Sequence, residues 1–222
     1  MALAPQFATH RIAGTASASH TLELFLDIVC PYSRKQLQGV RDHLLPLIDG
    51  DDGPLKDHLS IIIRQVPQPW HSSSTLVHEA ALAASKVLVD SGKQYSDPAV
   101  KHAWAKYFYA LIDGQEAFHD EPCAVESPNQ TRARLADLAA STIGVDRGAF
   151  LEAISVGKGN AGTPVTADLK LQIKFARSRA VHVTPTVFLD GLAEPSISSS
   201  FSGDDWKHFV NDKVLPSGAA KL

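Results

Sequence analysis

The residues best suited to chemistry are Cys30-Pro31-Tyr32-Ser33, which follow an apolar, β-prone run that starts at Leu22. A helical pattern begins directly after this turn, so Cys30 is expected at or near a helix N-terminus. The partial positive charge at that end of a helix stabilises a thiolate over a thiol. Pro31 fits the first helical turn, where its missing N–H costs nothing. The pattern therefore predicts that Cys30 is a nucleophile at neutral pH.

A second motif lies far downstream, where the run from Val181 to Gly191 reads Val-His-Val-Thr-Pro-Thr-Val-Phe-Leu-Asp-Gly. It indicates a loop that enters a strand through Thr184 and Pro185. Together the two motifs resemble the thioredoxin superfamily, in which a Cys-x-x-Cys turn faces a cis-proline loop. The resemblance implies that the Thr184–Pro185 bond is cis, that Pro185 lies close to Cys30, and that this loop holds an extended substrate backbone.

The turn departs from the superfamily's dithiol pattern, because Ser33 stands where the second cysteine would be. A second thiol releases a mixed disulfide by attacking it, and a hydroxyl cannot do this. The chain should therefore resemble monothiol enzymes, in which glutathione or another external thiol resolves the intermediate. Ser33 itself is expected either to donate a hydrogen bond to the Cys30 sulfur or to serve only as a small residue that suits the helix.

The composition is that of an ordinary globular protein and argues against two classes of partner. The 222 residues are 44% hydrophobic and 20% charged, with a formal net charge of −3. This length allows one large domain or a domain with an insertion. No basic patch interleaves with aromatic residues, so we expect no nucleic-acid partner. No apolar run approaches the roughly 18 residues that span a bilayer, so we expect no membrane partner.

The termini and the two cysteines bear on where the protein works. Two cysteines are too few for a disulfide scaffold. Met1–Ser19 lacks the basic start and apolar core of a signal peptide, so we expect residues 1–20 to form a mostly extended arm of an intracellular protein. The C-terminal Ala220-Lys221-Leu222 is a close variant of Ser-Lys-Leu, which leaves a cytoplasmic or a peroxisomal location open. Residues 216–222 are expected to form a flexible tail.

Hydrophobic periodicity predicts a chain that mixes strands and helices. The first part has a strand over Thr21–Val29, a helix from Tyr32 to about Ile48 that Pro46 kinks or ends early, and a buried parallel strand over Leu59–Val66. Helices follow at Ser72–Ser91, Pro98–Ile112, Gln130–Ile143, Arg147–Val156 and Asp168–Val181. The last part has a strand over Thr186–Leu189, a short hairpin strand over Ile197–Ser200 and a closing helix over Asp204–Val214.

This order of elements resembles the DsbA-like branch of the thioredoxin superfamily. The resemblance runs from Thr21 to Val214. It implies the fold class α/β, a thioredoxin-like fold with an α-helical insertion after the second strand. Residues 21–66 and 182–215 would form the thioredoxin-like domain, and residues 67–181 the insertion with its connecting helix. Kappa-class glutathione transferases and their isomerase relatives share this architecture, and the chain looks closest to a group of uncharacterised fungal thioredoxin-like proteins.

Several residues are expected to surround Cys30. Tyr32 would stack against substrate or glutathione at the mouth of the site, or would pack internally. Trp70 and His71 follow the second predicted strand, at the edge where open α/β sheets bind ligands, so they form the rim of the site or cap the strand. The predicted substrate-binding set is Pro31, Tyr32, Trp70, His71, Thr184 and Pro185.

The charged neighbours and the second cysteine have weaker assignments. Arg34 and Lys35 either favour the thiolate or are simply solvated, and Asp27 is either a proton acceptor or a satisfied strand-end group. Cys123 is the one internal candidate for a resolving thiol, but its acidic neighbours would raise its pKa. The histidines show no zinc-type spacing, so we expect no metal and no tightly bound cofactor.

The function predicted from these residues is that of a monothiol thiol-disulfide oxidoreductase. Cys30 would attack a protein or small-molecule disulfide, and an external thiol, with glutathione as a possible co-substrate, would resolve the product. One alternative is a glutathione-dependent transferase or isomerase of kappa-class type, although that class would be expected to have Ser at position 30. The other is a non-catalytic thioredoxin-fold module that binds peptides at Pro185. No pattern indicates the substrate or the oligomeric state.

Overall fold

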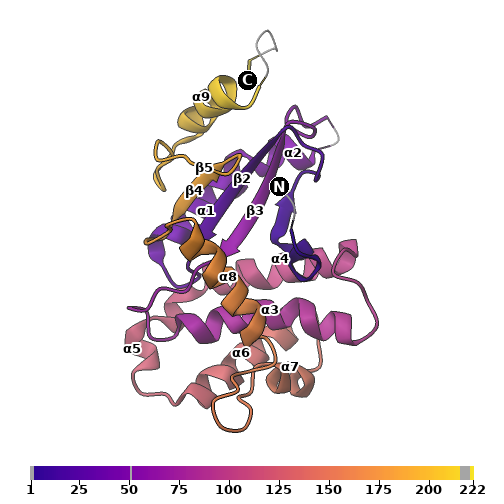
Figure 1. The fold of residues 1–222 in the computed structure, drawn as a ribbon, viewed down its shortest axis with the longest axis vertical. Coiled ribbons are helices and arrows are strands. Elements are labelled where there is room, and N and C mark those ends of the chain that lie inside the picture. The colour runs from indigo at the N-terminus through magenta and orange to yellow at the C-terminus, as the bar shows by residue number, and fades with distance from the viewer. Residues whose placement is uncertain (1–2, 51, 216–220) are drawn as a thin grey trace.

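The computed structural model describes residues 3–50, 52–215 and 221–222, and a five-stranded sheet forms its centre (Figure 1). The strand order is β1-β3-β2-β4-β5. β2 and β3 run parallel, as the sequence predicts, while the other neighbouring pairs are antiparallel. The strands are β1 Arg11–Ala13, β2 His20–Leu26, β3 Leu59–Gln65, β4 Thr186–Leu189 and β5 Leu192–Ala193.

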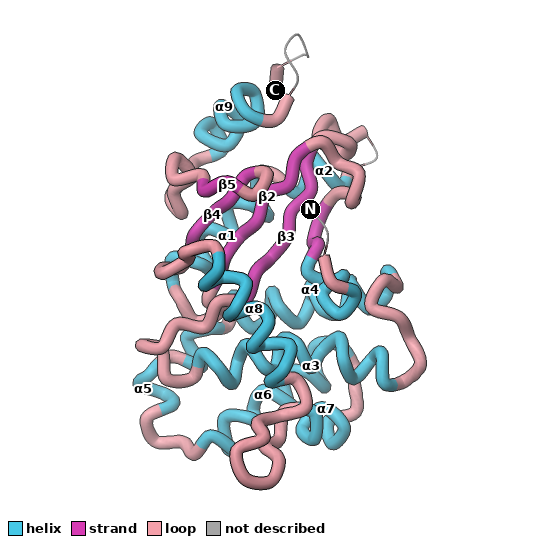
Figure 2. Tube along the Cα trace, viewed as in Figure 1, coloured by secondary structure: helices cyan, strands magenta, loops and turns pink. Residues whose placement is uncertain are grey.

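The helices fall into two groups (Figures 1 and 2). α1, α2 and α9 lie with the sheet, whereas α3, α4, α6 and α7 pack on one another as a bundle at one end of it. α8 leads from the bundle back to the sheet and contacts both α3 and β3. The helices are η1 Pro5–His10, α1 Pro31–His43, α2 Leu45–Asp49, α3 Ser74–Asp90, α4 Pro98–Asp113, η2 Gln115–Phe118, α5 Asp120–Cys123, α6 Pro128–Ile143, α7 Arg147–Ala153, α8 Thr166–Ser178 and α9 Gly203–Lys213.

β2 is buried on both faces of the sheet. Because successive side chains of a strand point to opposite sides, its residues contribute to two separate hydrophobic clusters. Leu22, Leu24 and Leu26 belong to the main core, which continues into α1 and the helical bundle. Phe25 points the other way and joins a smaller cluster, where Phe175 of α8 packs against it. The sheet is thus held from both sides, and the C-terminal end of β2 is a rigid base for the turn that follows.

The break in the first predicted helix is confirmed. α1 ends at His43, and α2 starts at Leu45 with Pro46 in its first turn, where a proline is tolerated. The preceding strand is shorter than predicted, because β2 ends at Leu26 and residues 27–29 form a turn. This shortening sets the position of Cys30 at the start of α1.

The prediction of an extended arm for residues 1–20 is wrong. Pro5–His10 forms the 3-10 helix η1, and Arg11–Ala13 is an edge strand that pairs antiparallel with β3. The physical reason is packing, since His10 is fully buried and its ring stacks on Trp104 of α4 at 4.6 Å between centroids. A strand this short has no periodicity of its own, so the sequence carried no signal for it.

The second strand of the C-terminal hairpin was also placed wrongly. It is Leu192–Ala193, and Ile197–Ser200 lies in turns. Asp190 and Gly191 both have positive φ, 51° and 83°, and form the two-residue turn between β4 and β5. Asp-Gly is a preferred pair for such a hairpin turn, because both central residues must adopt left-handed backbone conformations.

Residues 216–220 of the predicted tail lie outside the described residues, as does Ala220 of the C-terminal tripeptide. Leu222 is described, and its backbone N–H donates to Oδ1 of Asn211 in α9 at 2.9 Å. Among the helices in the described part of the chain, none has the length and apolar character needed to cross a membrane.

We expect His10 to make folding stability depend on pH. Burial, with the charge of Arg64, lowers the pKa of His10 from 6.5 to about 3. Between these two pH values His10 is therefore protonated in the unfolded chain and neutral in the folded chain. The free energy of unfolding is therefore not reduced by His10 above pH 6.5. It falls by roughly 4 kcal/mol as the pH falls toward 3. His10→Phe should flatten this part of the profile, measured by urea unfolding at pH 7 and pH 4.

His102→Phe is the matched control, because His102 is exposed on α4, the helix that carries Trp104. Its pH profile should follow that of the unmodified protein. A His10→Phe variant that loses as much stability between pH 7 and pH 4 as the unmodified protein would contradict the assignment.

Candidate functional site

Cys30 is the N-cap residue of α1, and Pro31 occupies the first helical turn. The backbone N–H of Cys30 donates to the carbonyl of Asp27 at 3.1 Å, which closes the turn after β2. Cys30 itself has an extended backbone and only 6% of its surface is exposed. The thiol therefore lies at a helix N-terminus, where the sequence predicts it, in a mostly dry environment.

The two motifs meet in space although they are 154 residues apart. Sγ of Cys30 lies 3.4 Å from the carbonyl oxygen of Thr184, which accepts a hydrogen bond from the thiol. The Thr184–Pro185 peptide bond is cis. β4 begins at Thr186 and pairs with β2, and this pairing brings the loop next to the Cys30 turn.

Ser33 has a different partner from the predicted one. Its side chain is fully buried, and its Oγ accepts a hydrogen bond from the backbone N–H of Asp27 at 3.2 Å. The sulfur of Cys30 bonds instead to Thr184. Asp27 lies between the end of β2 and the start of α1, so its buried backbone N–H needs an acceptor from outside these elements' own backbone. The Ser33 hydroxyl supplies one. Ser33 thus fixes the geometry of the turn.

Asp27 is the centre of a buried polar network under Cys30. Its carboxylate is fully buried and accepts five hydrogen bonds. The donors are the backbone N–H groups of Val29 at 3.2 Å and Gln68 at 3.1 Å, and the side chains of His71 at 2.7 Å, Ser74 at 2.7 Å and His78 at 3.2 Å.

These donors keep Asp27 ionised. Burial alone raises the pKa of the carboxyl group, but the hydrogen bond and charge of His78, with the hydrogen bonds of His71 and Ser74, outweigh burial and lower the pKa to about 2. Of the two roles considered for Asp27, the satisfied polar group fits this geometry. A carboxylate this acidic does not take up a proton at neutral pH.

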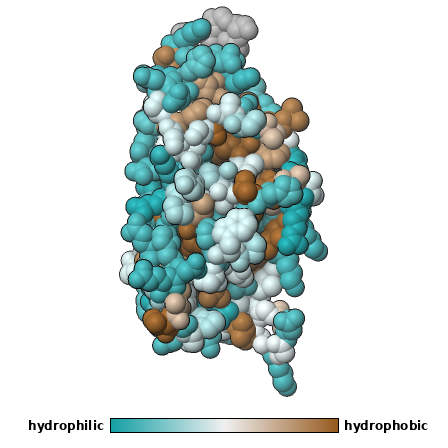
Figure 3. All heavy atoms as spheres, turned by 90° about the vertical axis from the view of Figure 1, so that its left-hand side faces the viewer, coloured by the Kyte–Doolittle hydropathy of each residue, from teal (hydrophilic) through white to brown (hydrophobic). Residues whose placement is uncertain are grey.

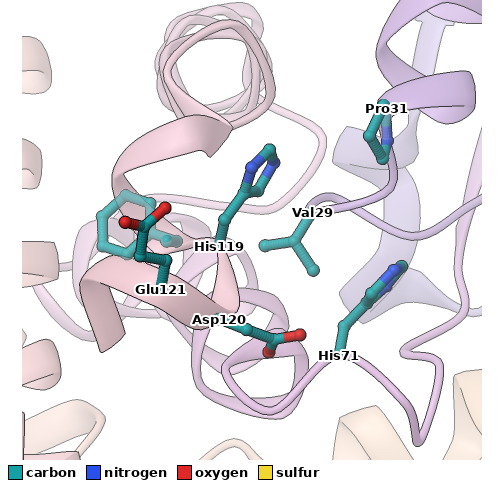
Figure 4. Close-up of a pocket in the computed structure, with 7 residues that line it drawn as sticks. Val29, Pro31, His71, His119, Asp120 and Glu121 are labelled. Atoms are coloured by element: carbon teal, nitrogen blue, oxygen red, sulfur yellow. The ribbon is translucent and has the colours of Figure 1, made fainter. Parts of the chain in front are cut away.

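A cavity of about 300 Å³ opens beside the Cys30 turn (Figure 4). Val29 and Pro31, the two neighbours of Cys30 in the chain, form one wall, and His71 lies across from His119 and Asp120. The ring of His71 is held by its 2.7 Å hydrogen bond to Asp27, and its side chain is 23% exposed. The cavity therefore has room for a small group beside the Cys30 turn, next to the chain neighbours of Cys30.

Two aromatic residues of the predicted binding set lie at the surface. Tyr32 is 66% exposed and Trp70 is 58% exposed, which leaves both rings open to a ligand. The face of the molecule that carries α5, on the left in Figure 1, shows hydrophobic residues in separate groups among hydrophilic ones (Figure 3).

The two cations near the turn are engaged elsewhere. Arg34 pairs with Glu116 at 2.8 Å, and Nζ of Lys35 donates to Ser200 at 2.9 Å. The expectation that their charges act on the Cys30 sulfur is therefore not supported by their contacts. The N-terminus of α1 is left as the main source of positive potential at the thiol.

No sequence pattern points to several residues of the site, because all of them come from the helical insertion. Nε2 of Gln115 donates to the carbonyls of Ile28 at 2.6 Å and Cys30 at 3.3 Å, and so holds the turn from the insertion side. His119 lines the cavity. Such residues have no fixed spacing from Cys30 in the chain, so only the fold brings them to it.

Cys123 is the last residue of the short helix α5, and both cysteines are free. Burial raises the pKa of Cys123, and Glu126 raises it further while Arg134 lowers it. Its sulfur lies 3.8 Å from the guanidinium of Arg134. No group of three or more His, Cys, Asp or Glu side chains that could hold a metal occurs within the described ranges.

We expect Asp27→Asn to destabilise the protein by about 3 kcal/mol at pH 7, because an amide presents a donor to groups that are themselves donors. The contribution of Asp27 exists above pH 3.8 and is lost as the pH falls from 3.8 toward 2, since the pKa is lowered in the folded state. The variant should lack this acid limb. Urea unfolding at pH 7 and acid titration of the fluorescence measure both effects.

Asp113→Asn provides the comparison, because Asp113 forms an exposed pair with Arg41 at 2.7 Å. Exposed pairs contribute at most about 1 kcal/mol. Equal losses in the two variants would mean that the network around Asp27 contributes no more than a surface contact.

No protein-family model matches the sequence, and no curated protein matches it. Solved structures match over most of the chain. One is a Pseudomonas syringae protein provisionally described as a protein-disulfide isomerase, with a TM-score of 0.65 and 24% identity, over 90% of this chain and 97% of that one. The thiol-disulfide exchange protein α-DsbA2 from Wolbachia pipientis gives 0.58 and 17%, over 90% and 84%. Chlamydia trachomatis DsbA gives 0.59 and 16%, over 96% and 95%.

These similarities concern the fold alone. The match to the Pseudomonas syringae structure covers 90% of this chain, which comprises the sheet, the helical domain inserted between β3 and β4, and the return through α8. The chain therefore has the thioredoxin-like fold of DsbA-like proteins.

Proposed function

We propose that the protein is a monothiol thiol-disulfide oxidoreductase with Cys30 as its nucleophile. The observation that carries the proposal is the placement of Sγ at the N-terminus of α1 and 3.4 Å from the Thr184 carbonyl. The helix end favours the thiolate, which is the reactive form in disulfide exchange. Support also comes from the fold, which the Wolbachia thiol-disulfide exchange protein shares.

The reaction begins when the Cys30 thiolate attacks one sulfur of a disulfide R–S–S–R′. The bond between Cys30 and that sulfur forms, the substrate S–S bond breaks, and R′S⁻ leaves and takes up a proton. An external thiol then attacks the substrate sulfur of the mixed disulfide. Cys30 leaves as a thiolate, and the external thiol becomes part of a new disulfide, so electrons and atoms balance.

The external thiol is needed because the site offers no second thiol. Ser33 occupies the position of a resolving cysteine, and its hydroxyl is engaged by Asp27. Cys123 has a raised pKa and lies against Arg134 and Glu126. Glutathione is the external thiol we propose, because it is the common small thiol of reducing compartments.

The substrate would lie along the Thr184 loop, where exposed backbone next to a strand can pair with an extended segment. Val183, just before the loop, is 59% exposed. Tyr32 and Trp70 would cover the substrate from the other side with their exposed rings. Such a site recognises backbone and apolar surface more than any one side chain, which suits a protein or peptide disulfide.

The proposal predicts turnover of the mixed disulfide between glutathione and a short cysteine peptide. With glutathione in excess, oxidised glutathione should form, measured as NADPH consumption by added glutathione reductase. Cys30→Ser should reduce the rate to that of the uncatalysed exchange, and Cys123→Ser should leave it unchanged. Intact mass should reveal one glutathionyl adduct, on Cys30.

Two outcomes would contradict the proposal. Conjugation of glutathione to an electrophile by Cys30→Ser would favour the transferase alternative. Peptide binding at the Thr184 loop without turnover or adduct would favour the non-catalytic module.

Ser33→Cys should convert the protein into a dithiol enzyme. Positions 30 and 33 lie on the same side of the first turn of α1, so the introduced thiol can reach Cys30. Under oxidising glutathione buffers, the variant should lose two hydrogens in its intact mass and no longer keep a glutathionyl adduct. A variant that stays reduced with its fold intact, judged by circular dichroism, would show that the turn cannot close a disulfide.

A further inference from the structure

The cavity beside Cys30 has lining residues that the substrate loop does not share. They come from the Cys30 turn, from the segment after β3 and from the start of α5, and do not include Thr184 or Pro185. Its volume of about 300 Å³ suits a small molecule and not a folded segment. A substrate that occupies the Thr184 loop therefore leaves this cavity open to a second reactant.

His71 is the one cavity residue whose ring is anchored by the Asp27 carboxylate. Oδ2 of Asp27 accepts at 2.7 Å, so Nδ1 of His71 must carry the proton of this hydrogen bond. The neutral ring then has its lone pair on Nε2, which bonds to no other group in the described part of the chain. Figure 4 shows the ring extending toward Pro31 and away from Asp120.

A histidine oriented in this way by a buried carboxylate is arranged as a general base. The carboxylate fixes the tautomer and stabilises the imidazolium that forms when Nε2 takes a proton. Asp27 stays ionised throughout, because its other donors hold its charge. Asp27 is a positioning residue here, and His71 is the group that meets the reactant.

We propose that this cavity admits the external thiol that resolves the Cys30 mixed disulfide, and that His71 is the base that takes its proton. The inference rests on the proposed function. In the step, Nε2 of His71 accepts the proton of the incoming R″S–H, and R″S⁻ attacks the substrate sulfur. The bond from that sulfur to Cys30 breaks, a disulfide between R″S and the substrate forms, and the Cys30 thiolate takes the proton back from His71 directly or through water.

The charges that face His71 favour this cycle. Asp27 lies on one side, in the turn after β2, and Asp120 of α5 lies on the other side of the cavity. His119, just before α5, lines the same space, and His78 of α3 shares the Asp27 carboxylate. The two carboxylates stabilise an imidazolium at His71. Glu121 lines the outer part of the cavity.

The test separates proton transfer from binding by the acidity of the attacking thiol. The protein is first loaded with glutathione on Cys30, and loss of the adduct is followed by intact mass after rapid mixing with a thiol. Glutathione is largely protonated at neutral pH and needs a base. A fluorinated alkyl thiol, ionised to a large extent at the assay pH, does not. His71→Gln, which keeps a donor for Asp27, should slow release by glutathione about 100-fold and leave release by the fluorinated thiol nearly unchanged.

Three comparisons make the result specific. His208→Gln, at an exposed position on α9, should match the unmodified protein with both thiols. His119→Gln should affect both thiols equally if it acts only through binding. In His71→Ala, added imidazole should restore release by glutathione, since the cavity can hold the free base.

The outcomes are distinct. Equal slowing of both thiols by His71→Gln, no slowing at all, or a selective loss in His119→Gln instead would overturn the role of His71 while leaving Cys30 exchange intact. An unmodified protein that forms no adduct on Cys30, or never releases it, would contradict the proposed function itself and this inference with it.

Discussion

The site depends on one buried carboxylate. Removing Asp27 from water is costly, and the cost is met only because five donors converge on its two oxygens. Those donors come from the Cys30 turn, from the chain after β3 and from α3, the first helix of the insertion. The same hydrogen bonds that satisfy the charge therefore join the sheet to the helical domain at the position where Cys30 is held.

Backbone groups set the surroundings of the Cys30 sulfur. The sulfur of Cys30 lies between the N-terminus of α1 and the carbonyl of Thr184. A helix N-terminus favours an anion, whereas a carbonyl oxygen accepts a hydrogen bond only from the protonated thiol, so the two backbone groups act on the sulfur in opposite directions. Side-chain cations contribute less, because Arg34 and Lys35 are bonded to other groups.

The loss of a second thiol also has a structural consequence. The hydroxyl of Ser33 accepts the N–H of Asp27, which keeps the end of β2 in register with the start of α1. The position that carries a resolving thiol in a dithiol turn is used here to shape the turn. Under the proposed function an external thiol needs space beside the Cys30 turn, and we assign to it the cavity between the turn and α5.

The sequence by itself determined the Cys30 turn, the parallel pair β2–β3, most helices and the Thr184–Pro185 loop, because each is encoded by local periodicity or by neighbouring residues. It did not determine β1, whose three residues become a strand only when the edge of β3 and Trp104 are present to bury them and His10. It also did not determine the partner of His71 or the contribution of Gln115. These depend on contacts between distant segments, and the desolvation of Asp27 that selects them exists only once the insertion has packed against the sheet.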